Sequence, residues 1–101
     1  MTDPLEIRYL STAESDLENI FDYIIKDRPA AAKSLLEEID RSVARLSSNP
    51  DIGAIPKDER LAKMGYRILI IQKYLVFYVV KPKFIQIRRI IHGARQYGFL
   101  L

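Results

Sequence analysis

The sequence predicts an α+β fold in which a helical hairpin packs on one face of an antiparallel sheet, with the element order β-α-α-β-β-β. Residues 5–46 hold one short alternating run and then two stretches whose apolar residues recur at helical spacing. Residues 66–92 hold three apolar runs rich in Ile, Val, Tyr and Phe, and the short connectors between these runs join antiparallel neighbours. At 101 residues the chain has the length of one domain, so we expect residues 1–101 to fold as a single unit.

The first strand and the first helix are predicted at the N-terminus. Leu5–Leu10 alternates in polarity, which indicates a short strand with one apolar side. Ser11 precedes Glu14 by three residues, the spacing of a capping box that opens a helix. This helix is expected to bury an apolar stripe that consists of Ala13, Leu17, Ile20, Phe21, Ile24 and Ile25.

A second helix is predicted after a tight break at Lys26–Pro29, because proline suits the first helical turn. It is expected to stop at Ser47–Pro50, and its apolar stripe consists of Ala32, Leu35, Leu36, Ile39, Val43 and Leu46. Since the break is short, the two helices should form an antiparallel hairpin whose stripes pack on each other and on the sheet. Residues 50–64 then form a long connector, within which Asp58–Met64 can make a helical turn.

Counting residues across the two connectors assigns each side chain of the three C-terminal strands to one face of the sheet. The count takes a two-residue loop at 72–73 and a three-residue loop at 81–83. Ile71 would then lie opposite Tyr74 and Val80 opposite Phe84, and directly opposite residues share a face. The face expected to meet the helices collects Tyr66, Ile68, Ile70, Leu75, Phe77, Val79, Ile85, Ile87 and Ile91. The face expected to stay open collects Arg67, Leu69, Ile71, Tyr74, Val76, Tyr78, Gln86, Arg88, Ile90 and His92. A register slip of one residue would exchange the two faces.

The predicted open face coincides with a basic part of the sequence. Residues 65–101 contain no Asp or Glu. Residues 1–50 hold 10 acids and 6 bases, whereas residues 51–101 hold 3 acids and 10 bases, which predicts an acidic helical side and a basic sheet side. A basic sheet suits nucleic acid or an acidic protein partner, although a basic surface can also serve solubility alone.

His92, the only histidine, ends the last predicted strand on this face and is a candidate for chemistry. Arg67, Tyr78 and Arg88 share its predicted face. Arginine stabilises the charge that develops on a phosphodiester under attack, and His or Tyr moves protons, so these residues have the chemistry of a nuclease. The same residues would also make a phosphate-binding patch or a docking site for an acidic peptide. A histidine at a strand end is more often structural than catalytic.

Other classes of site are excluded by the residues present. Without cysteine there is no disulfide or thiolate chemistry, which fits a reducing compartment. With one histidine and no zinc-ligand spacing we expect no metal site, and without a glycine-rich phosphate loop we expect no cofactor. The N-terminus lacks a signal-peptide pattern, and no apolar run approaches the roughly 20 residues that span a bilayer. We therefore expect a cytoplasmic protein with no membrane contact.

Together with this element order, several motifs resemble the RelE/ParE superfamily of bacterial toxins from type II toxin–antitoxin modules. They are Asn-Pro-x-x-Gly at Asn49–Gly53, Tyr-Arg-Ile-Leu at Tyr66–Leu69, Tyr-Leu-Val-Phe-Tyr at Tyr74–Tyr78 and Arg-Ile-Ile-His-Gly-Ala-Arg-Gln-Tyr at Arg89–Tyr97. The resemblance implies a cytoplasmic toxin of the plasmid-stabilisation type, which a cognate antitoxin neutralises by wrapping a disordered segment around it. It also implies that operator DNA is bound only through the antitoxin.

The superfamily has two modes of action. RelE-like members cut mRNA on the ribosome without a metal, and for that reaction the resemblance points to Arg67, His92, Arg95 and Tyr97. ParE-like members poison DNA gyrase without that set. Leu75 stands where RelE-like nucleases typically have an arginine, which favours gyrase as the target and leaves mRNA cleavage as the alternative. A non-toxic binding or regulatory module is the third interpretation.

The residues predicted to contact the target or its phosphates are Arg67, Tyr78, Arg88, His92 and Arg95. No catalytic role is assigned to them outside the nuclease alternative. A homodimer is a further prediction. It would form through the open edge of the Tyr66–Ile71 strand or through the tail Phe99–Leu101.

Overall fold

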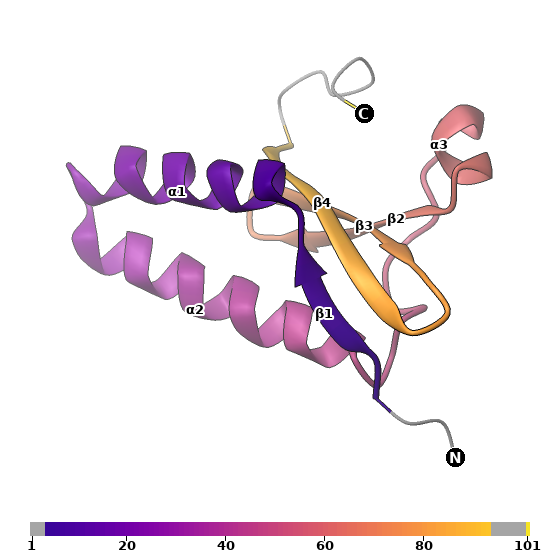
Figure 1. Cartoon of the computed structure of the whole chain (residues 1–101). Coiled ribbons are helices and arrows are strands. Elements are labelled where there is room, and N and C mark those ends of the chain that lie inside the picture. The colour runs from indigo at the N-terminus through magenta and orange to yellow at the C-terminus, as the bar shows by residue number, and fades with distance from the viewer. Residues whose placement is uncertain (1–3, 94–100) are drawn as a thin grey trace.

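A computed structural model describes residues 4–93 and 101 of the chain. In order, its elements are β1 (Glu6–Tyr9), α1 (Ser11–Ile25), α2 (Pro29–Leu46), α3 (Glu59–Lys63), β2 (Tyr66–Ile71), β3 (Tyr74–Val80) and β4 (Phe84–His92). The predicted order β-α-α-β-β-β is therefore confirmed, with α3 as the helical turn of the connector. Figure 1 shows two layers, in which the antiparallel hairpin of α1 and α2 packs beside the sheet.

The sheet is mixed, which corrects the prediction of a wholly antiparallel one. Its strand order is β1-β4-β3-β2, with antiparallel pairs β2–β3 and β3–β4 and a parallel pair β1–β4. β1 lies at an edge of the sheet, beside β4. The direction of β1 could not be predicted from its alternating pattern, because that pattern is the same whichever way the strand runs.

α1 begins without the predicted capping box. Ser11 is already helical, and Leu10 takes the N-cap position with no side-chain hydrogen bond. The backbone of β4 fixes this end instead. The Leu10 N–H donates to the Ile87 carbonyl at 2.9 Å, and the Thr12 hydroxyl donates to the Arg88 carbonyl at 3.1 Å. Contacts with the sheet thus replace the local cap that the sequence predicts.

α1 also covers the part of the β4 edge that β1 leaves unpaired. β1 pairs only with Phe84–Ile87. Beyond it, the Asp16 carboxylate accepts a hydrogen bond from the Ile90 N–H at 2.9 Å and two from the Arg89 guanidinium at 2.8 and 2.9 Å. The Asp16 side chain is 14% exposed and the Arg89 side chain 20%. The hydrogen bond to Asp16 raises the pKa of Arg89. Through these three hydrogen bonds Asp16 joins α1 to β4.

The helical hairpin covers the opposite face of β2 and β3 from the one predicted. Val80 lies opposite Ile85 rather than Phe84, and the pairing of β3 with β4 shifts register midway along the strands. Beneath the hairpin, the buried sheet residues are Ile71, Val76, Tyr78, Ile85, Ile87 and Ile90, which pack with Leu35, Ile39, Val43 and Leu46 of α2. The parity prediction is therefore wrong for β2, β3 and the end of β4.

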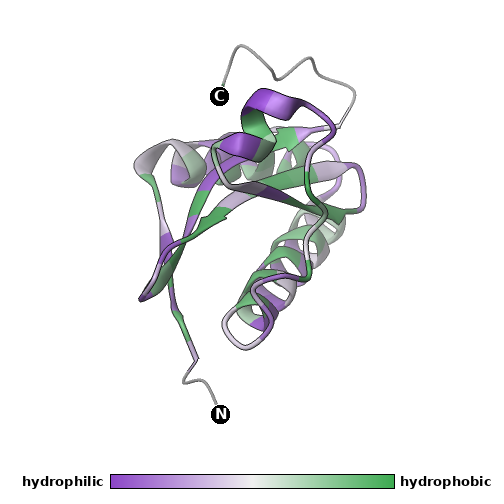
Figure 2. Cartoon of the chain, turned by 90° about the vertical axis from the view of Figure 1, so that its right-hand side faces the viewer, coloured by the Kyte–Doolittle hydropathy of each residue, from purple (hydrophilic) through white to green (hydrophobic). Residues whose placement is uncertain are grey.

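The reversal has a physical cause, because both faces of these strands are apolar. A second buried cluster lies on the far face and consists of Leu61, Tyr66, Phe77, Val79 and Ile91, with Ile68, Leu75 and Leu101 packed against it. Figure 2 shows the strands as largely hydrophobic along their length. A strand that is covered on both sides has apolar residues at successive positions instead of alternating ones. Such a sequence does not indicate which face meets the helices.

From the environment of Tyr9 we expect the folded protein to become less stable in alkaline solution. Burial, helped by the nearby Asp40 carboxylate, raises the pKa of Tyr9 from 10.0 to about 12. The unfolded chain therefore ionises first, so the free energy of unfolding should hold below about pH 10 and fall as the pH rises towards 12. We expect Tyr9→Phe to make this fall shallower in urea unfolding measured across that range. Tyr23→Phe, at an exposed tyrosine, is the control, and equal slopes in all three proteins would contradict the prediction.

Candidate functional site

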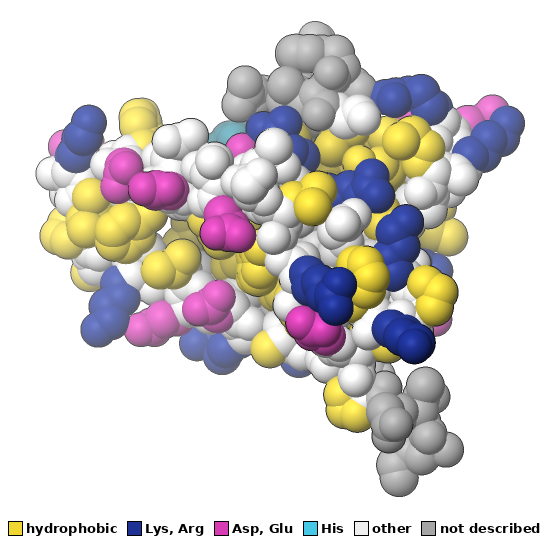
Figure 3. Space-filling model, viewed as in Figure 1, with side chains coloured by type: hydrophobic (Ala, Val, Ile, Leu, Met, Phe, Trp, Pro, Cys, Tyr) yellow, Lys and Arg dark blue, Asp and Glu magenta, His cyan; other side chains and the backbone are white. Residues whose placement is uncertain are grey.

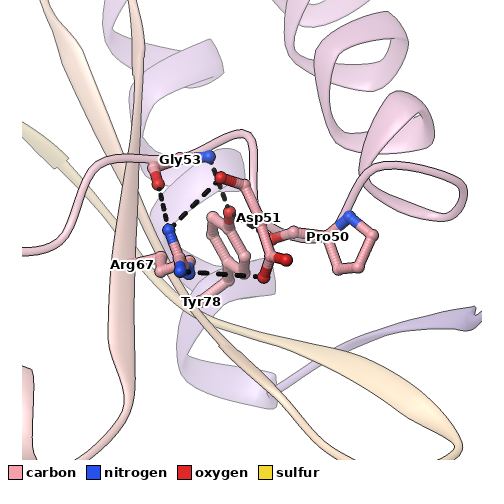
Figure 4. Close-up of polar contacts among 5 residues, drawn as sticks. All are labelled: Pro50, Asp51, Gly53, Arg67 and Tyr78. Carbon is pink, nitrogen blue, oxygen red and sulfur yellow. Dashed lines mark hydrogen bonds and ion pairs between the residues drawn. The ribbon is translucent and has the colours of Figure 1, made fainter.

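The Arg67 guanidinium is bound to the loop between α2 and α3 (Figure 4). It donates to the carbonyl oxygens of Gly53 at 2.8 Å and Asp51 at 3.2 Å, and its Nη2 lies 3.7 Å from the Asp51 carboxylate. The Arg67 side chain is 26% exposed. Because these oxygens already occupy one end of the guanidinium, fewer of its donors are left for a phosphate. The contacts assign Arg67 first to holding this loop against the sheet.

Tyr78 lies buried beneath the same loop. Its hydroxyl donates to the Pro50 carbonyl at 2.8 Å and accepts from the Gly53 N–H at 2.9 Å. A Cβ on Gly53 would lie 2.5 Å from this hydroxyl, so only glycine fits. Burial raises the pKa of Tyr78, so its hydroxyl stays protonated, as the bond to Pro50 requires, to a higher pH than an exposed tyrosine does. We term Pro50, Gly53, Arg67 and Tyr78 the loop lock, and it gives the Asn-Pro-x-x-Gly motif a structural role.

Arg88 lies on the far face of the sheet, away from the hairpin. Its Nε donates to the Gln86 side chain at 2.8 Å, and its guanidinium carbon lies 5.4 Å from the centre of the Tyr66 ring. Arg8 stacks similarly, 4.3 Å from the centre of the Phe84 ring. In the view of Figure 3, Lys and Arg side chains gather over the strands and their connectors, whereas most visible Asp and Glu lie over the helices. The far face thus presents arginines supported by aromatic rings.

His92 ends β4 beside the turn that joins β2 to β3. Its ring lies opposite Tyr74, with centroids 5.3 Å apart and planes at 83°. Both rings line a groove of about 660 Å³ between this turn and the turn that joins α1 to α2. Tyr23, Arg28 and Lys73 are also among the residues that line it. We term this feature the turn groove.

The outer edge of β2 is paired with Ala54 at Ile68 and is apolar and open beyond that point. Ala54 and Ile68 exchange two backbone hydrogen bonds of 2.9 Å, so Ile68 directs its N–H and C=O away from β3. By the alternation of an antiparallel ladder, Ile70 directs its own N–H and C=O the same way. The Ile70 side chain is 71% exposed, and together with Ile52 it lines a hollow of about 380 Å³. We term this surface, with the exposed Ile55 nearby in sequence, the β2 edge.

The predicted anion-binding face does not exist as one surface. Tyr78 is buried under the hairpin, Arg67 is bound to a loop, Arg88 lies on the far face and His92 lines the turn groove. The prediction fails because it placed the helices on the wrong side of β2 and β3. Arg95 and Tyr97 lie outside the described residues. Tyr23, Arg28 and Lys73 were missed because they lie in or beside turns far apart in sequence, and no periodic pattern joins them.

Within residues 4–93 and 101, no group of three side chains is placed to hold a metal ion. None of the helices in this part of the chain is long and apolar enough to cross a membrane.

Residues 7–97 match the sequence model of one family, described as the ParE toxin of the type II toxin–antitoxin system parDE. A chain from the chromosomal ParDE toxin–antitoxin system of P. aeruginosa has a similar fold, with a TM-score of 0.73 and 24% identity over 90% of this chain and 98% of that one. A chain from the RelBE2 toxin–antitoxin complex of Mycobacterium tuberculosis gives a TM-score of 0.60 and 24% identity over 88% of this chain and 98% of that one. No curated protein matches the sequence.

Proposed function

Because the chain belongs to the family of ParE toxins of type II toxin–antitoxin systems, we propose that a cognate antitoxin neutralises it and that the free toxin poisons DNA gyrase in the cytoplasm. This membership confirms the resemblance to the RelE/ParE superfamily. The alternative function is cleavage of mRNA on the ribosome, which differs from gyrase poisoning in the residues that it requires.

The observation that favours gyrase is the separation of Arg67 from His92, the two candidate nuclease residues that the structure describes. Metal-independent cleavage needs a cation on the phosphate and a proton-transfer group close to the same bond. Among the described residues, Arg67 is bound to loop carbonyls, whereas His92 lines the turn groove. Leu75, at the position where the nuclease branch has arginine, packs against the cluster around Leu61. A protein that acts by binding gyrase does not require these groups to converge.

The β2 edge is the surface that best suits the antitoxin. An exposed strand edge pairs readily with an extended segment of another chain, whose backbone continues the ladder. Ile70 supplies outward backbone groups, Ile52 adds exposed apolar surface in the same hollow, and the exposed Ile55 follows Ala54 in sequence. A disordered antitoxin segment could order here as a strand and bury these isoleucines. Operator binding would then belong to the antitoxin part of the complex.

Induced expression of the toxin should separate the two targets. We expect double-strand DNA breaks and an SOS response, together with DNA-cleavage complexes when the purified toxin is added to purified gyrase. Ribosome-bound mRNA should stay intact, as measured by primer extension. Co-expression of the antitoxin is the control and should restore growth. Cleaved mRNA without DNA breaks would select the nuclease alternative, and unimpaired growth would select the non-toxic module.

A further inference from the structure

The turn groove shares no lining residue with the hollow at the β2 edge, and neither core packing nor the proposed antitoxin contact accounts for it. We propose that it is the target-recognition site of the toxin and that it binds a short acidic segment of the target protein. This inference rests on the proposed function in one respect, because it requires the target to be a protein.

The lining of the turn groove combines aromatic rings with an apolar floor. Tyr23 on α1 is 78% exposed, and Tyr74 and His92 form an edge-to-face pair on the sheet side. Ile24 and Leu35 of the helices complete the lining between them. A volume of about 660 Å³ falls within the usual range for ligand sites, roughly 300–1,000 Å³. The groove can therefore take one or two side chains of a partner, including an aromatic one.

Both walls of the groove are held in place by hydrogen bonds. On the sheet side, the Gln72 side chain donates to the Glu38 carboxylate at 2.8 Å, and the Gly93 N–H donates to the Lys73 carbonyl at 2.7 Å. On the helix side, the Arg28 N–H donates to the Ile24 carbonyl at 2.8 Å. A site whose walls are already ordered loses little conformational entropy when it binds.

Two cations flank the groove, one on each wall. Arg28 lies at the start of α2 and Lys73 in the β2–β3 turn, and Asp27 is the one acid in the lining. Among the residues that the structure describes, neither Arg28 nor Lys73 has a side-chain hydrogen bond or an ion pair. Carboxylates are strong partners for such groups, and arginine binds them through two parallel hydrogen bonds. An acidic side chain beside an apolar or aromatic one matches this lining.

The charges around the groove favour a peptide over a nucleic acid. Asp27 lies in the lining, and Glu14, Glu18 and Asp22 are exposed along α1. A phosphate backbone that crosses this helix would be repelled at several points, whereas a segment with one or two carboxylates could place them at Arg28 and Lys73. The groove therefore suits a local acidic contact rather than a polyanion.

The composition of the groove also favours the target over the antitoxin. Obligate interfaces are the more hydrophobic ones, whereas non-obligate interfaces are about as polar as the rest of the protein surface. The β2 edge has the first character, with exposed Ile52, Ile55 and Ile70. The turn groove has the second, so we assign it to the partner that the toxin engages only when free.

Charge reversal at the groove tests this assignment. Arg28→Glu with Lys73→Glu should weaken binding to purified gyrase at least about tenfold, one decade corresponding to the loss of a single strong contact, and should abolish growth arrest. Binding of the antitoxin should change by less than about twofold. Lys33→Glu with Arg41→Glu, at exposed positions of α2 outside the groove, is the matched control for net charge. Ile70→Glu should behave in the opposite way, with antitoxin binding lost and toxicity kept.

A peptide titration tests the groove independently of the target. In nuclear magnetic resonance spectra of the whole wild-type protein, acetyl-Asp-Phe-Glu-amide should shift signals of Tyr23, Lys73 and His92, and acetyl-Lys-Phe-Lys-amide should not. Shifts at these residues with a thymidine oligonucleotide instead of the acidic peptide would overturn the inference. Full toxicity of the groove variant would overturn it as well. If wild-type toxin leaves gyrase unaffected, the proposed target fails, while this titration still decides what the groove binds.

Discussion

Asp16→Ala is expected to lower the free energy of unfolding by about 3 kcal/mol at neutral pH. The substitution leaves the mostly buried Arg89 guanidinium without its carboxylate and leaves the Ile90 N–H without an acceptor at the edge of β4. Losing one partner of such a pair costs more than the pair itself contributes, because the remaining charge stays poorly solvated. In a domain of this size the thermal midpoint should fall by about 15 °C.

Glu18→Ala is the matched control, since Glu18 is exposed on the same helix. Its effect should stay within about 0.5 kcal/mol. Asp16→Asn keeps an acceptor for the Ile90 N–H but removes the charge, so it should fall between the two alanine variants. Urea unfolding at constant ionic strength measures all three. An Asp16→Ala protein as stable as Glu18→Ala would show that the ion pair does not hold α1 on the sheet.

Gly53→Ala is expected to cost about 2–3 kcal/mol of unfolding free energy through steric overlap. The new Cβ would lie 2.5 Å from the Tyr78 hydroxyl, 2.7 Å from Cε1 of the same ring and 3.0 Å from the Ile68 carbonyl. The Tyr78 ring is buried in the core and cannot withdraw, so the loop must move and lose its bonds to Arg67 and Tyr78. Because the same loop places Ala54 beside Ile68, antitoxin binding should weaken too.

A double-mutant cycle identifies the cause of that loss. Tyr78→Phe removes the hydroxyl that overlaps the new Cβ, so Gly53→Ala should cost less in the Tyr78→Phe protein than in the wild type. Ala54→Ser, at the exposed neighbouring position, is the control and should be close to neutral. Additive losses in the cycle would rule out a clash with the hydroxyl as the cause.

Helix and strand positions could be predicted because local patterns determine them. The stripe from Ala32 to Leu46 and the proline at Pro29 indicate α2, and the structure places its ends at Pro29 and Leu46. The three apolar runs with their short connectors likewise indicate β2, β3 and β4. The start of α1 at Ser11 was predicted, but its cap was not, because the helix N-terminus is held by carbonyl groups of β4 rather than by the Ser11 side chain.

The sequence of a single strand does not indicate which face of the sheet meets the helical hairpin. Two buried clusters sandwich β3, so Val76 and Phe77 are both fully buried although they point to opposite sides. Alternation cannot then distinguish the side covered by α2 from the side covered by α3. The register shift between β3 and β4 adds a second uncertainty, because it reverses the parity of the residues at the end of β4.

The candidate sites also depend on contacts between segments that are distant in sequence. Arg67 and Tyr78 were identified as important from their chemistry, but their partners Pro50 and Gly53 assign them to the loop lock. The turn groove depends on two turns that approach one another only in the folded chain. His92 could therefore be identified as a candidate from its residue type alone. Arg28 and Lys73 could be identified as groove residues only from the tertiary structure.

The two outer strands of the sheet set a limit on assembly. β1 is four residues long and exposes Glu6 and Arg8, whereas β2 is longer and apolar at its outer side. Growth of a filament by strand addition needs two compatible outer strands, one to receive the next molecule and one to join the last. Within residues 4–93 and 101, β2 is the outer strand suited to pairing, so under the proposed β2-edge interaction a complex built by strand addition would stop at a stoichiometry of one to one.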